Sequence, residues 1–398
     1  MVAVIPWHML LRTVTEINFV ELKLADRHRL ECFLADTREK TSSFLGYPSP
    51  KDFDFSLFKE FLNYPINNIG DPFKDSAYTV TSHSFERDVL SDVAGMLRAP
   101  EQDWWGYVTN GGTEGNLYGL YLARELYPDG IVYFSQASHY SVAKNVHFLN
   151  MRHIMIRARN NGEIDYDDLI ETLKIHRDVP AIIFANIGTT MTEAKDDIRK
   201  IIEITDNLAI CNRYIHSDAA LCGAYASFLD PRPAFDFEDG ADSISISGHK
   251  FLGSPIPCGV VLARKTVVDR IARSITYIGT LDTTITGSRN GLTPLLLWYS
   301  IRILGEAGMR KRINGALEIA AYATHRLNAI DVAAWRNQNA ITVVLPAPSL
   351  DLQQKYQLAS ADGQSHIVTM PGVTRQDIDC FVADLIQDVS YSSSIHEG

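Results

Sequence analysis

The feature that most constrains the fold is an alternation of short apolar runs with longer helical patterns, extending from Trp105 to about Lys265. The residues between the runs place apolar side chains at helical spacing, as over 114–126, 165–175 and 196–206. The runs are mostly apolar throughout, which indicates strands covered on both faces. This pattern predicts an α/β fold with a mostly parallel central sheet and helices on both faces. The predicted strands are Ile131–Ser135, His153–Ala158, Ala181–Gly188, Arg213–Ala220, Ser243–Ser247 and Gly259–Arg264.

The remaining chain predicts two flanking parts. With 398 residues, two or three structural units are expected. We expect an N-terminal helical segment over 1–80, a large α/β domain over 81–290 and a small α+β C-terminal domain over 291–398. The C-terminal domain is expected to hold a long helix at 295–327, strands at 340–346 and 365–371, and a helix at 374–389.

The charge and the cysteines of the chain argue against several classes of partner and site. The chain carries 37 Lys and Arg against 48 Asp and Glu, a net charge of -11. An acidic chain argues against nucleic acid or an anionic membrane surface as partner. The five cysteines are scattered and form no C-x-x-C pair, which favours reduced thiols over disulfides or a zinc site. The chain shows neither a basic leader nor an apolar run of about 20 residues, so we expect a cytoplasmic protein without a metal centre.

The strongest local motif is SISISGHK, in which a predicted strand leads into Lys250. Ligands of α/β folds bind at the carboxyl ends of the strands. Lysine is the side chain that condenses reversibly with an aldehyde cofactor. Alone the motif is weak evidence, because most lysines in such places are simply solvated.

The motif HSDAA places Asp218 at the end of another predicted strand. An Asp there can pair with the pyridine nitrogen of pyridoxal phosphate (PLP) and keep it protonated, which makes the ring an electron sink. Asp218 is also a plausible cap for a following helix, and taken alone that interpretation is the more common one.

Three further motifs follow predicted strands. In TNGGTEGN, Gly112 and Thr113 open a helix and can bind an anion, although Thr113 as an ordinary helix cap is an alternative. His139 in SHYSVAKN can stack on a pyridine ring or belong to a polar loop. Thr190 in GTT can supply a hydroxyl at the same edge or form a local turn. Together the five motifs contain the parts that a PLP site requires.

These motifs, with YPDG, NGEIDYDDL, PAIIFANIGTT, GSPIPCG, TITGSRNG and AWRNQNAITVVLP, resemble the group II PLP-dependent decarboxylases, and most closely the Gram-negative bacterial histidine decarboxylases. The likeness runs from about residue 46 to about residue 389. It implies an aspartate-aminotransferase-like (type I) fold with PLP as cofactor, decarboxylation of an L-amino acid, and a homodimer with sites at the subunit interface.

The resemblance also implies roles for single residues. Lys250 corresponds to the Schiff-base lysine, Asp218 to the pyridinium partner, and His139 to the residue that stacks on the ring and orients the substrate carboxylate. The phosphate ligands that it implies are Gly112, Thr113, Ser247 and His249.

Further implied roles concern the ring and the neighbouring subunit. Thr190 and Ala220 are expected to contact the ring, and the GSRNG turn with Ser288 and Arg289 to reach the neighbouring subunit's cofactor. Tyr277 is the expected proton donor, on a loop that closes over the site.

The implied substrate is L-histidine, with histamine and carbon dioxide as products. His83 stands where close histidine decarboxylases have an aromatic residue, and Leu292 where they have His. Plant serine decarboxylases share much of the motif set, so serine or another amino acid stays open. A PLP aminotransferase or aldehyde synthase on the same scaffold, and a non-catalytic relative, are further alternatives.

Overall fold

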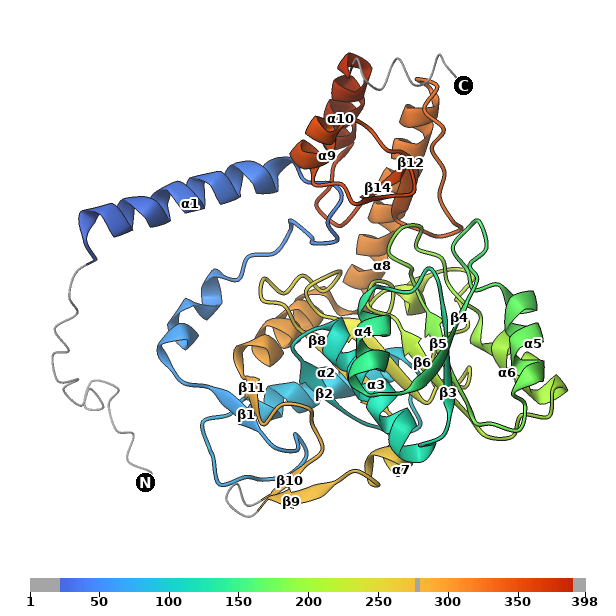
Figure 1. Cartoon of the computed structure of the whole chain (residues 1–398). Coiled ribbons are helices and arrows are strands. Elements are labelled where there is room, and N and C mark those ends of the chain that lie inside the picture. Colours follow the sequence, from blue (N-terminus) through green and yellow to red (C-terminus); the bar gives the residue numbers. More distant parts are fainter. Residues whose placement is uncertain (1–21, 276–279, 389–398) are drawn as a thin grey trace, which may run out of the picture. The chain divides into compact units, whose positions relative to one another are not determined.

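The computed structural model describes residues 22–275 and 280–388 (Figure 1). The chain divides into two compact units, residues 1–44 and 45–398. The first unit contributes helix α1 (Leu24–Ser43), in which no residue is buried. The further division expected at residues 80 and 290 stays a prediction.

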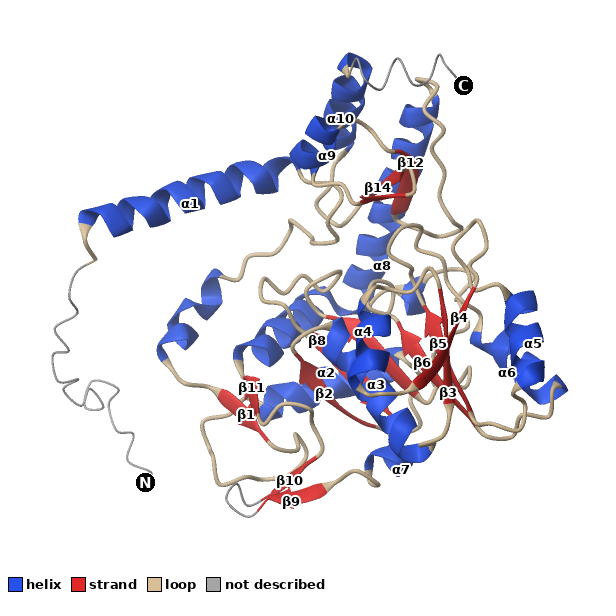
Figure 2. Ribbon diagram, viewed as in Figure 1, coloured by secondary structure: helices blue, strands red, loops and turns tan. Residues whose placement is uncertain are grey.

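The second unit is built around a seven-stranded sheet (Figure 2). Neighbouring strands are parallel from β4 to β7, and β8 alone of the seven described strands runs opposite to the others. The expected α/β fold with a mostly parallel sheet is thereby confirmed. In spatial order the strands are β2 (Trp105–Thr109), β8 (Gly259–Ala263), β7 (Ser243–Ser247), β6 (Arg213–Asp218), β5 (Ala181–Asn186), β3 (Ile131–Ser135) and β4 (Arg152–Ile156).

Each face of this sheet has its own apolar core, because successive side chains of a strand point to opposite faces. Val132 and Phe184 pack on one face with helices α3 (Gly112–Leu126) and α4 (Ser141–Phe148). Tyr133 and Ile183 pack on the other face with α2 (His83–Met96), α5 (Tyr166–Ile175) and α6 (Ile198–Asn207). Covering of both faces explains the continuous apolar runs in the sequence.

The C-terminal region contains the expected long helix and small sheet. Helix α8 (Leu292–Asn328) is interrupted at Gly305, whose φ is 56°. An antiparallel sheet follows in the order β12 (Thr342–Pro346), β14 (Gln364–Val368) and β13 (Ser360–Ala361). Two further helices of the C-terminal region are α9 (Leu350–Tyr356) and α10 (Arg375–Gln387). Thr374 and Asp377 form a capping box at the start of α10.

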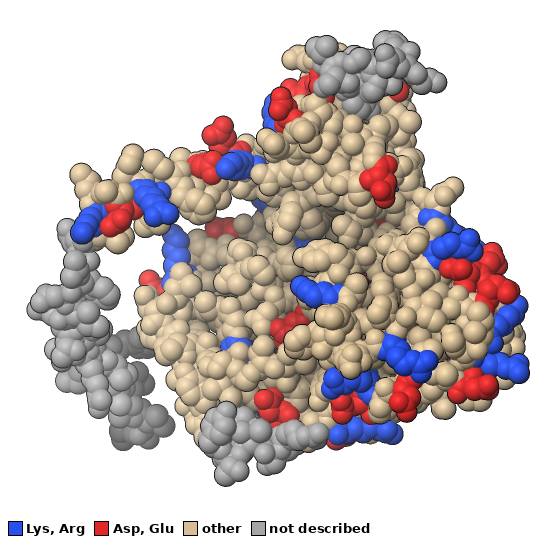
Figure 3. Space-filling view, viewed as in Figure 1, with Lys and Arg blue, Asp and Glu red and all other residues tan. Residues whose placement is uncertain are grey.

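Short elements complete the second unit. Strand β1 (Asn67–Ile69) pairs antiparallel with β11 (Ser288–Asn290), and β9 (Arg273–Ile275) pairs with β10 (Thr280–Asp282). The short helices are η2 (Ser56–Asn63), η3 (Ala226–Phe228) and α7 (Lys265–Val268). Within the described ranges, no helix combines the length and apolarity needed to cross a membrane. Acidic and basic side chains are interspersed over the face seen in Figure 3.

Candidate active site

A cavity of about 300 Å³ opens where β5, β6 and β7 end and α3 begins. The carboxyl ends of parallel strands meet at this edge, so side chains far apart in the sequence converge there. Residues of the C-terminal sheet region and of the segment after α1 complete the wall. The lining residues are Gly46, Tyr47, Pro48, Gly112, Thr113, Asn116, His139, Ser141, Asn186, Gly188, Thr189, Thr190, Asp218, Ala220, Leu221, Ser247, His249, Lys250, Ala359, His366 and Val368.

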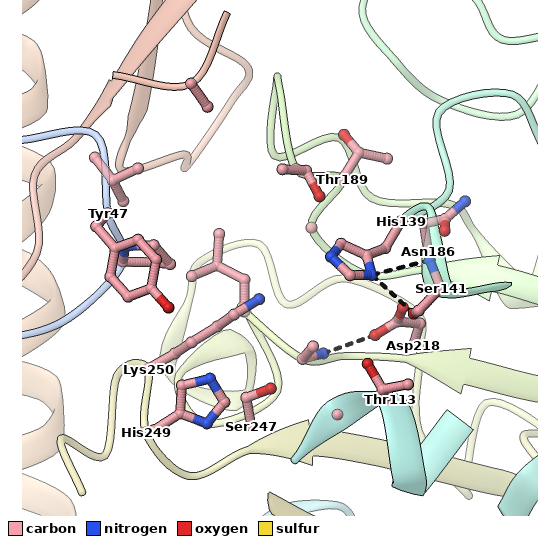
Figure 4. A pocket seen from close by; sticks show the side chains of 18 of the residues that line it. Tyr47, Thr113, His139, Ser141, Asn186, Thr189, Asp218, Ser247, His249 and Lys250 are labelled. Atoms are coloured by element: carbon pink, nitrogen blue, oxygen red, sulfur yellow. Dashed lines mark hydrogen bonds between the residues drawn. The ribbon is translucent and has the colours of Figure 1, made fainter. Parts of the chain in front are cut away.

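Lys250 extends its side chain into this cavity from the turn after β7 (Figure 4). Loss of solvation by burial lowers the pKa of Lys250, and the nearby carboxylate of Asp218 partly opposes that shift. A lower pKa increases the fraction of neutral amine, which is the nucleophilic form. The surroundings of Lys250 therefore favour attack on an aldehyde.

Asp218 is the last residue of β6 and is nearly buried, with 7% of its surface exposed. Its Oδ2 accepts a hydrogen bond from Asn116 Nδ2 at 2.8 Å, and its Oδ1 accepts one from the backbone N–H of Ala220 at 3.1 Å. Each carboxylate oxygen can accept more than one hydrogen bond. Asp218 is thus held in a fixed orientation and retains capacity to accept from a ligand.

His139 lies beyond the end of β3, on the same side of the cavity as Asp218 (Figure 4). Its Nδ1 accepts from the backbone N–H of Ser141 at 3.3 Å and lies 2.8 Å from Ser141 Oγ. Burial lowers the pKa of His139, which favours a neutral ring. With Nδ1 as the acceptor, the ring proton is on Nε2, which faces the space between His139 and Lys250.

The first turn of α3 is suited to bind an anion. Its N-cap is Gly111, with a φ of 146°, and a glycine has no side chain to cap the first N–H groups. A Cβ on Gly112 would lie 2.8 Å from Ser247 Oγ, so that hydroxyl borders the same turn. Burial lowers the pKa of His249, and its Nδ1 accepts from the backbone N–H of Cys258 at 3.3 Å, which leaves Nε2–H to donate to a ligand. A phosphate group fits this combination of uncapped N–H groups, hydroxyls and imidazole.

These features together fit PLP. The cavity offers an amine for its aldehyde, a carboxylate for its ring nitrogen, a flat imidazole for its ring face and an anion site for its phosphate. The volume is at the lower end of the range found for small-molecule sites, as expected for a compact cofactor with a small substrate.

The structure brings together most of the residues selected from the sequence. Nine of them line the cavity, namely Gly112, Thr113, His139, Thr190, Asp218, Ala220, Ser247, His249 and Lys250. Ser288 lies apart on β11, where its Oγ accepts from Asn67 Nδ2 at 3.1 Å. Tyr277 falls outside the described residues.

Two details differ from the sequence interpretation. Helix α3 begins at Gly112, so Gly111 and not Thr113 is its N-cap. Arg289 is buried inside its own subunit, where it forms an ion pair with Glu86. The guanidinium of Arg289 is therefore occupied within its own chain.

Several cavity residues were not selected from the sequence. Asn116 lies one helical turn after Gly112, so the spacing of four residues was an available signal. Ser141 is the first residue of α4, in the loop-and-helix region after β3, and Asn186 lies within the predicted strand Ala181–Gly188 and is the last residue of β5. Tyr47 and His366 come from distant segments and carry no local signal. The Nδ1 atom of His366 is buried without a hydrogen-bond partner among the described residues, so it can accept from a ligand.

Comparison with known proteins agrees with this site. The model of the "Pyridoxal-dependent decarboxylase conserved domain" matches residues 37–332. A histidine decarboxylase of Mesorhizobium japonicum is 51% identical, over 91% of this chain and 98% of that protein. A histidine decarboxylase of Acinetobacter baumannii is 46% identical, over 94% and 98% respectively.

A solved structure shows the same fold. L-methionine decarboxylase from Streptomyces sp. 590 superposes with a TM-score of 0.86 at 26% sequence identity, covering 93% of this chain and 96% of that chain. The matched domain includes each cavity residue to which the sequence analysis gave a role. The chain therefore belongs to the pyridoxal-dependent decarboxylase family.

Proposed function

We propose that this PLP-dependent decarboxylase converts L-histidine to histamine and carbon dioxide. The observation that carries the chemistry is the convergence of Lys250, Asp218 and His139 on one cavity beside the uncapped start of α3. The substrate is supported by relatives named histidine decarboxylase that are 43–51% identical over most of this chain.

In this proposal Lys250 and Asp218 hold the cofactor, Lys250 at its aldehyde and Asp218 at its ring nitrogen. The neutral amine of Lys250 would hold the cofactor through its aldehyde until the substrate amine takes its place. Asp218 accepts a hydrogen bond from the ring nitrogen and keeps it protonated. The bound cofactor supplies a ring that takes up the electron pair released when the bond to carbon dioxide breaks.

His139 and the first turn of α3 provide orientation. His139 stacks on the ring, and its Nε2–H donates to the substrate carboxylate. This contact would hold the substrate carboxylate in one orientation and so favour its loss over other reactions. Gly112, Thr113, Ser247 and His249 bind the phosphate.

Two cavity residues contact the ring in this proposal, and a third residue protonates the product. Thr190 and Ala220 line the same cavity as Lys250 and are the assigned ring contacts. Tyr277 is the proposed proton donor to the product carbanion, outside the described residues.

A homodimer is part of the proposal, with Ser288 reaching the neighbouring subunit's site. Helix α1 buries none of its residues, although Leu24 is 84% and Phe33 is 68% exposed. In the second unit, η2 likewise leaves Leu57 and Leu62 exposed. Apolar side chains in such number favour burial against a second copy. A cytoplasmic location also belongs to the proposal, and the five cysteines are free thiols.

Product analysis tests the substrate. The purified protein is loaded with PLP and incubated separately with L-histidine, L-serine and L-methionine, while carbon dioxide and amine are quantified. We expect equimolar histamine and carbon dioxide from histidine at a kcat/KM at least tenfold above the other two. Ethanolamine from serine as the main product overturns the substrate assignment. Formation of a keto acid or an aldehyde instead of the amine overturns the reaction.

Light scattering tests the assembly. We expect the mass of two chains for the wild-type protein, and a shift toward one chain when Phe33 and Leu57 are replaced by Glu. A wild-type protein with the mass of one chain contradicts the dimer without bearing on the substrate.

A further inference from the structure

Polar side chains form a continuous seam between α3 and the sheet. Tyr214, His216 and Asp218 alternate along β6 and therefore share one face of the sheet. Ser243 on β7 lies beside them, because β7 pairs with β6 at His216. Asn116 faces them from α3. The seam ends at Asp218 in the cavity.

Hydrogen bonds join these side chains into one chain. Tyr214 OH lies 2.8 Å from Ser243 Oγ, which lies 2.7 Å from His216 Nδ1. His216 Nε2 lies 2.9 Å from Asn116 Oδ1, and Asn116 Nδ2 lies 2.8 Å from Asp218 Oδ2. Four contacts thus connect the carboxylate to a tyrosine in the apolar core.

Only one direction of donation is consistent with an ionised Asp218. A carboxylate only accepts, so the amide of Asn116 must donate to it through Nδ2 and accept through Oδ1. His216 must then carry its proton on Nε2. A neutral His216 accepts at Nδ1 from the Ser243 hydroxyl, which accepts in turn from Tyr214. Every donor in the chain therefore points toward Asp218, and such chains strengthen their terminal bond.

The surroundings of His216 fit this assignment. Its side chain is buried, and burial lowers its pKa to about 3, so the ring is neutral. Its ring packs against α3 at Gly119, where an added Cβ would lie 2.1 Å from Nδ1. The absence of a side chain at Gly119 lets the imidazole reach Asn116 one turn away.

We infer that Asn116 and His216 are positioning residues that hold the Asp218 carboxylate aligned for the ring nitrogen of the cofactor. This inference rests on the role proposed above for Asp218. It extends the site by one layer, from the carboxylate to the groups that orient it. A purely structural network would stabilise the fold but would leave the properties of the bound cofactor unchanged.

Three substitutions and one control separate these roles. Asn116→Leu removes the donor to Asp218, and His216→Phe removes the proton that orients Asn116. His216→Gln keeps one donor and one acceptor at similar spacing and serves as the rescue variant. Ser217→Ala is the control, because Ser217 is equally buried on β6 but its hydroxyl bonds the Phe235 carbonyl on the other face.

The first measurement uses the protein without cofactor. Nitrogen-15 NMR of histidine-labelled protein identifies the His216 signal as the one missing in His216→Phe. We expect a neutral ring protonated at Nε2 between pH 5 and 8. A proton on Nδ1, or a charged ring at pH 7, overturns the inference. Because this measurement involves neither cofactor nor substrate, it stands even if the proposed function fails.

The second measurement uses the bound cofactor. Loss of a hydrogen bond to a charged group weakens binding by about tenfold or more. We expect PLP to dissociate about tenfold more readily from Asn116→Leu and His216→Phe, with a shifted pH midpoint of its absorbance. His216→Gln should stay within about threefold of wild type. KM for the amino acid should change little while kcat falls.

The control decides between the two explanations. Ser217→Ala should lower stability but leave the PLP dissociation constant and absorbance unchanged. Wild-type PLP affinity and absorbance in folded His216→Phe overturn the inference, even if Asn116→Leu does not fold. If the cofactor behaves as expected but histidine yields no amine, the substrate assignment fails and the positioning role remains.

Discussion

Replacement of Arg289 by Ala should destabilise the fold strongly. Arg289 lies on β11 and forms an ion pair with Glu86 of α2, and the exposed fractions of the two side chains are 2% and 0%. Its Nη2 also donates to the Gly70 carbonyl at 3.0 Å. Among the residues that the structure describes, two other groups donate to Glu86, namely Asn68 Nδ2 at 2.7 Å and Val108 N at 2.9 Å. Those donors are neutral, so the arginine supplies the countercharge.

The magnitude follows from what the substitution leaves behind. Removal of one partner of a buried pair leaves an uncompensated charge and typically costs about 3–5 kcal/mol. Because a domain is stable by only about 5–15 kcal/mol, this is a large fraction of the total. Arg302→Ala is the matched control. Arg302 pairs with Asp92 at 3.2 Å but its side chain is 49% exposed, and such pairs contribute about 0–1 kcal/mol.

Urea unfolding at one fixed protein concentration measures both changes in the free energy of unfolding. Adding Glu86→Gln to Arg289→Ala should recover part of the loss, because the buried charge is then removed. A cost below about 1 kcal/mol for Arg289→Ala, equal to that of the control, would refute the buried-pair reasoning. It would favour a role for Arg289 outside its own subunit.

Two other predictions concern packing and protonation. Gly119→Ala places a Cβ against His216 and should cost about 1–3 kcal/mol by overpacking. Gly315→Ala, on an exposed part of α8 with no atom within 4 Å, should be neutral or stabilising in the same urea experiment, and equal effects of the two contradict the packing argument. The rate at which the cofactor-free protein captures pyridoxal should rise with pH through a midpoint below that of free lysine, because burial lowers the pKa of Lys250. Asp218→Asn removes the carboxylate that raises this pKa, so the midpoint should fall further, and a rise contradicts the account.

Much of the central sheet was predictable from local sequence. The predicted strands at Ile131–Ser135 and Ser243–Ser247 begin and end where the structure has them. The site residues at strand ends were predictable for the same reason, because parallel strands deliver their carboxyl ends to one edge. Asn116 could also have been predicted as a cavity residue, because it lies four residues after Gly112 and therefore on the same face of the helix.

The antiparallel direction of β8 could not be predicted from the sequence pattern of its strand. An apolar strand covered on both faces has the same composition whether it runs parallel or antiparallel. The segment between β7 and β8, residues 248–258, contains no helix in the structure. Parallel neighbours need a crossover of a dozen or more residues, so the short connection indicates the antiparallel pairing.

Contacts between distant segments had no local signal at all. Arg289 and Glu86 are about 200 positions apart, and neither residue type nor spacing connects them. The same holds for Tyr47 and His366, which reach the cavity from opposite ends of the second unit. The alternation of Tyr214, His216 and Asp218 was visible in the sequence, but its meaning depends on α3 packing over that face.

The role of Lys250 is tested most directly by locating the covalently held cofactor on the chain. The PLP-loaded protein is reduced with borohydride, digested and mapped by mass spectrometry. We expect a pyridoxyl group on Lys250 in nearly every molecule, and neither label nor histamine formation in Lys250→Ala. A label on another lysine, or full histamine formation by Lys250→Ala, would show that Lys250 does not hold the cofactor.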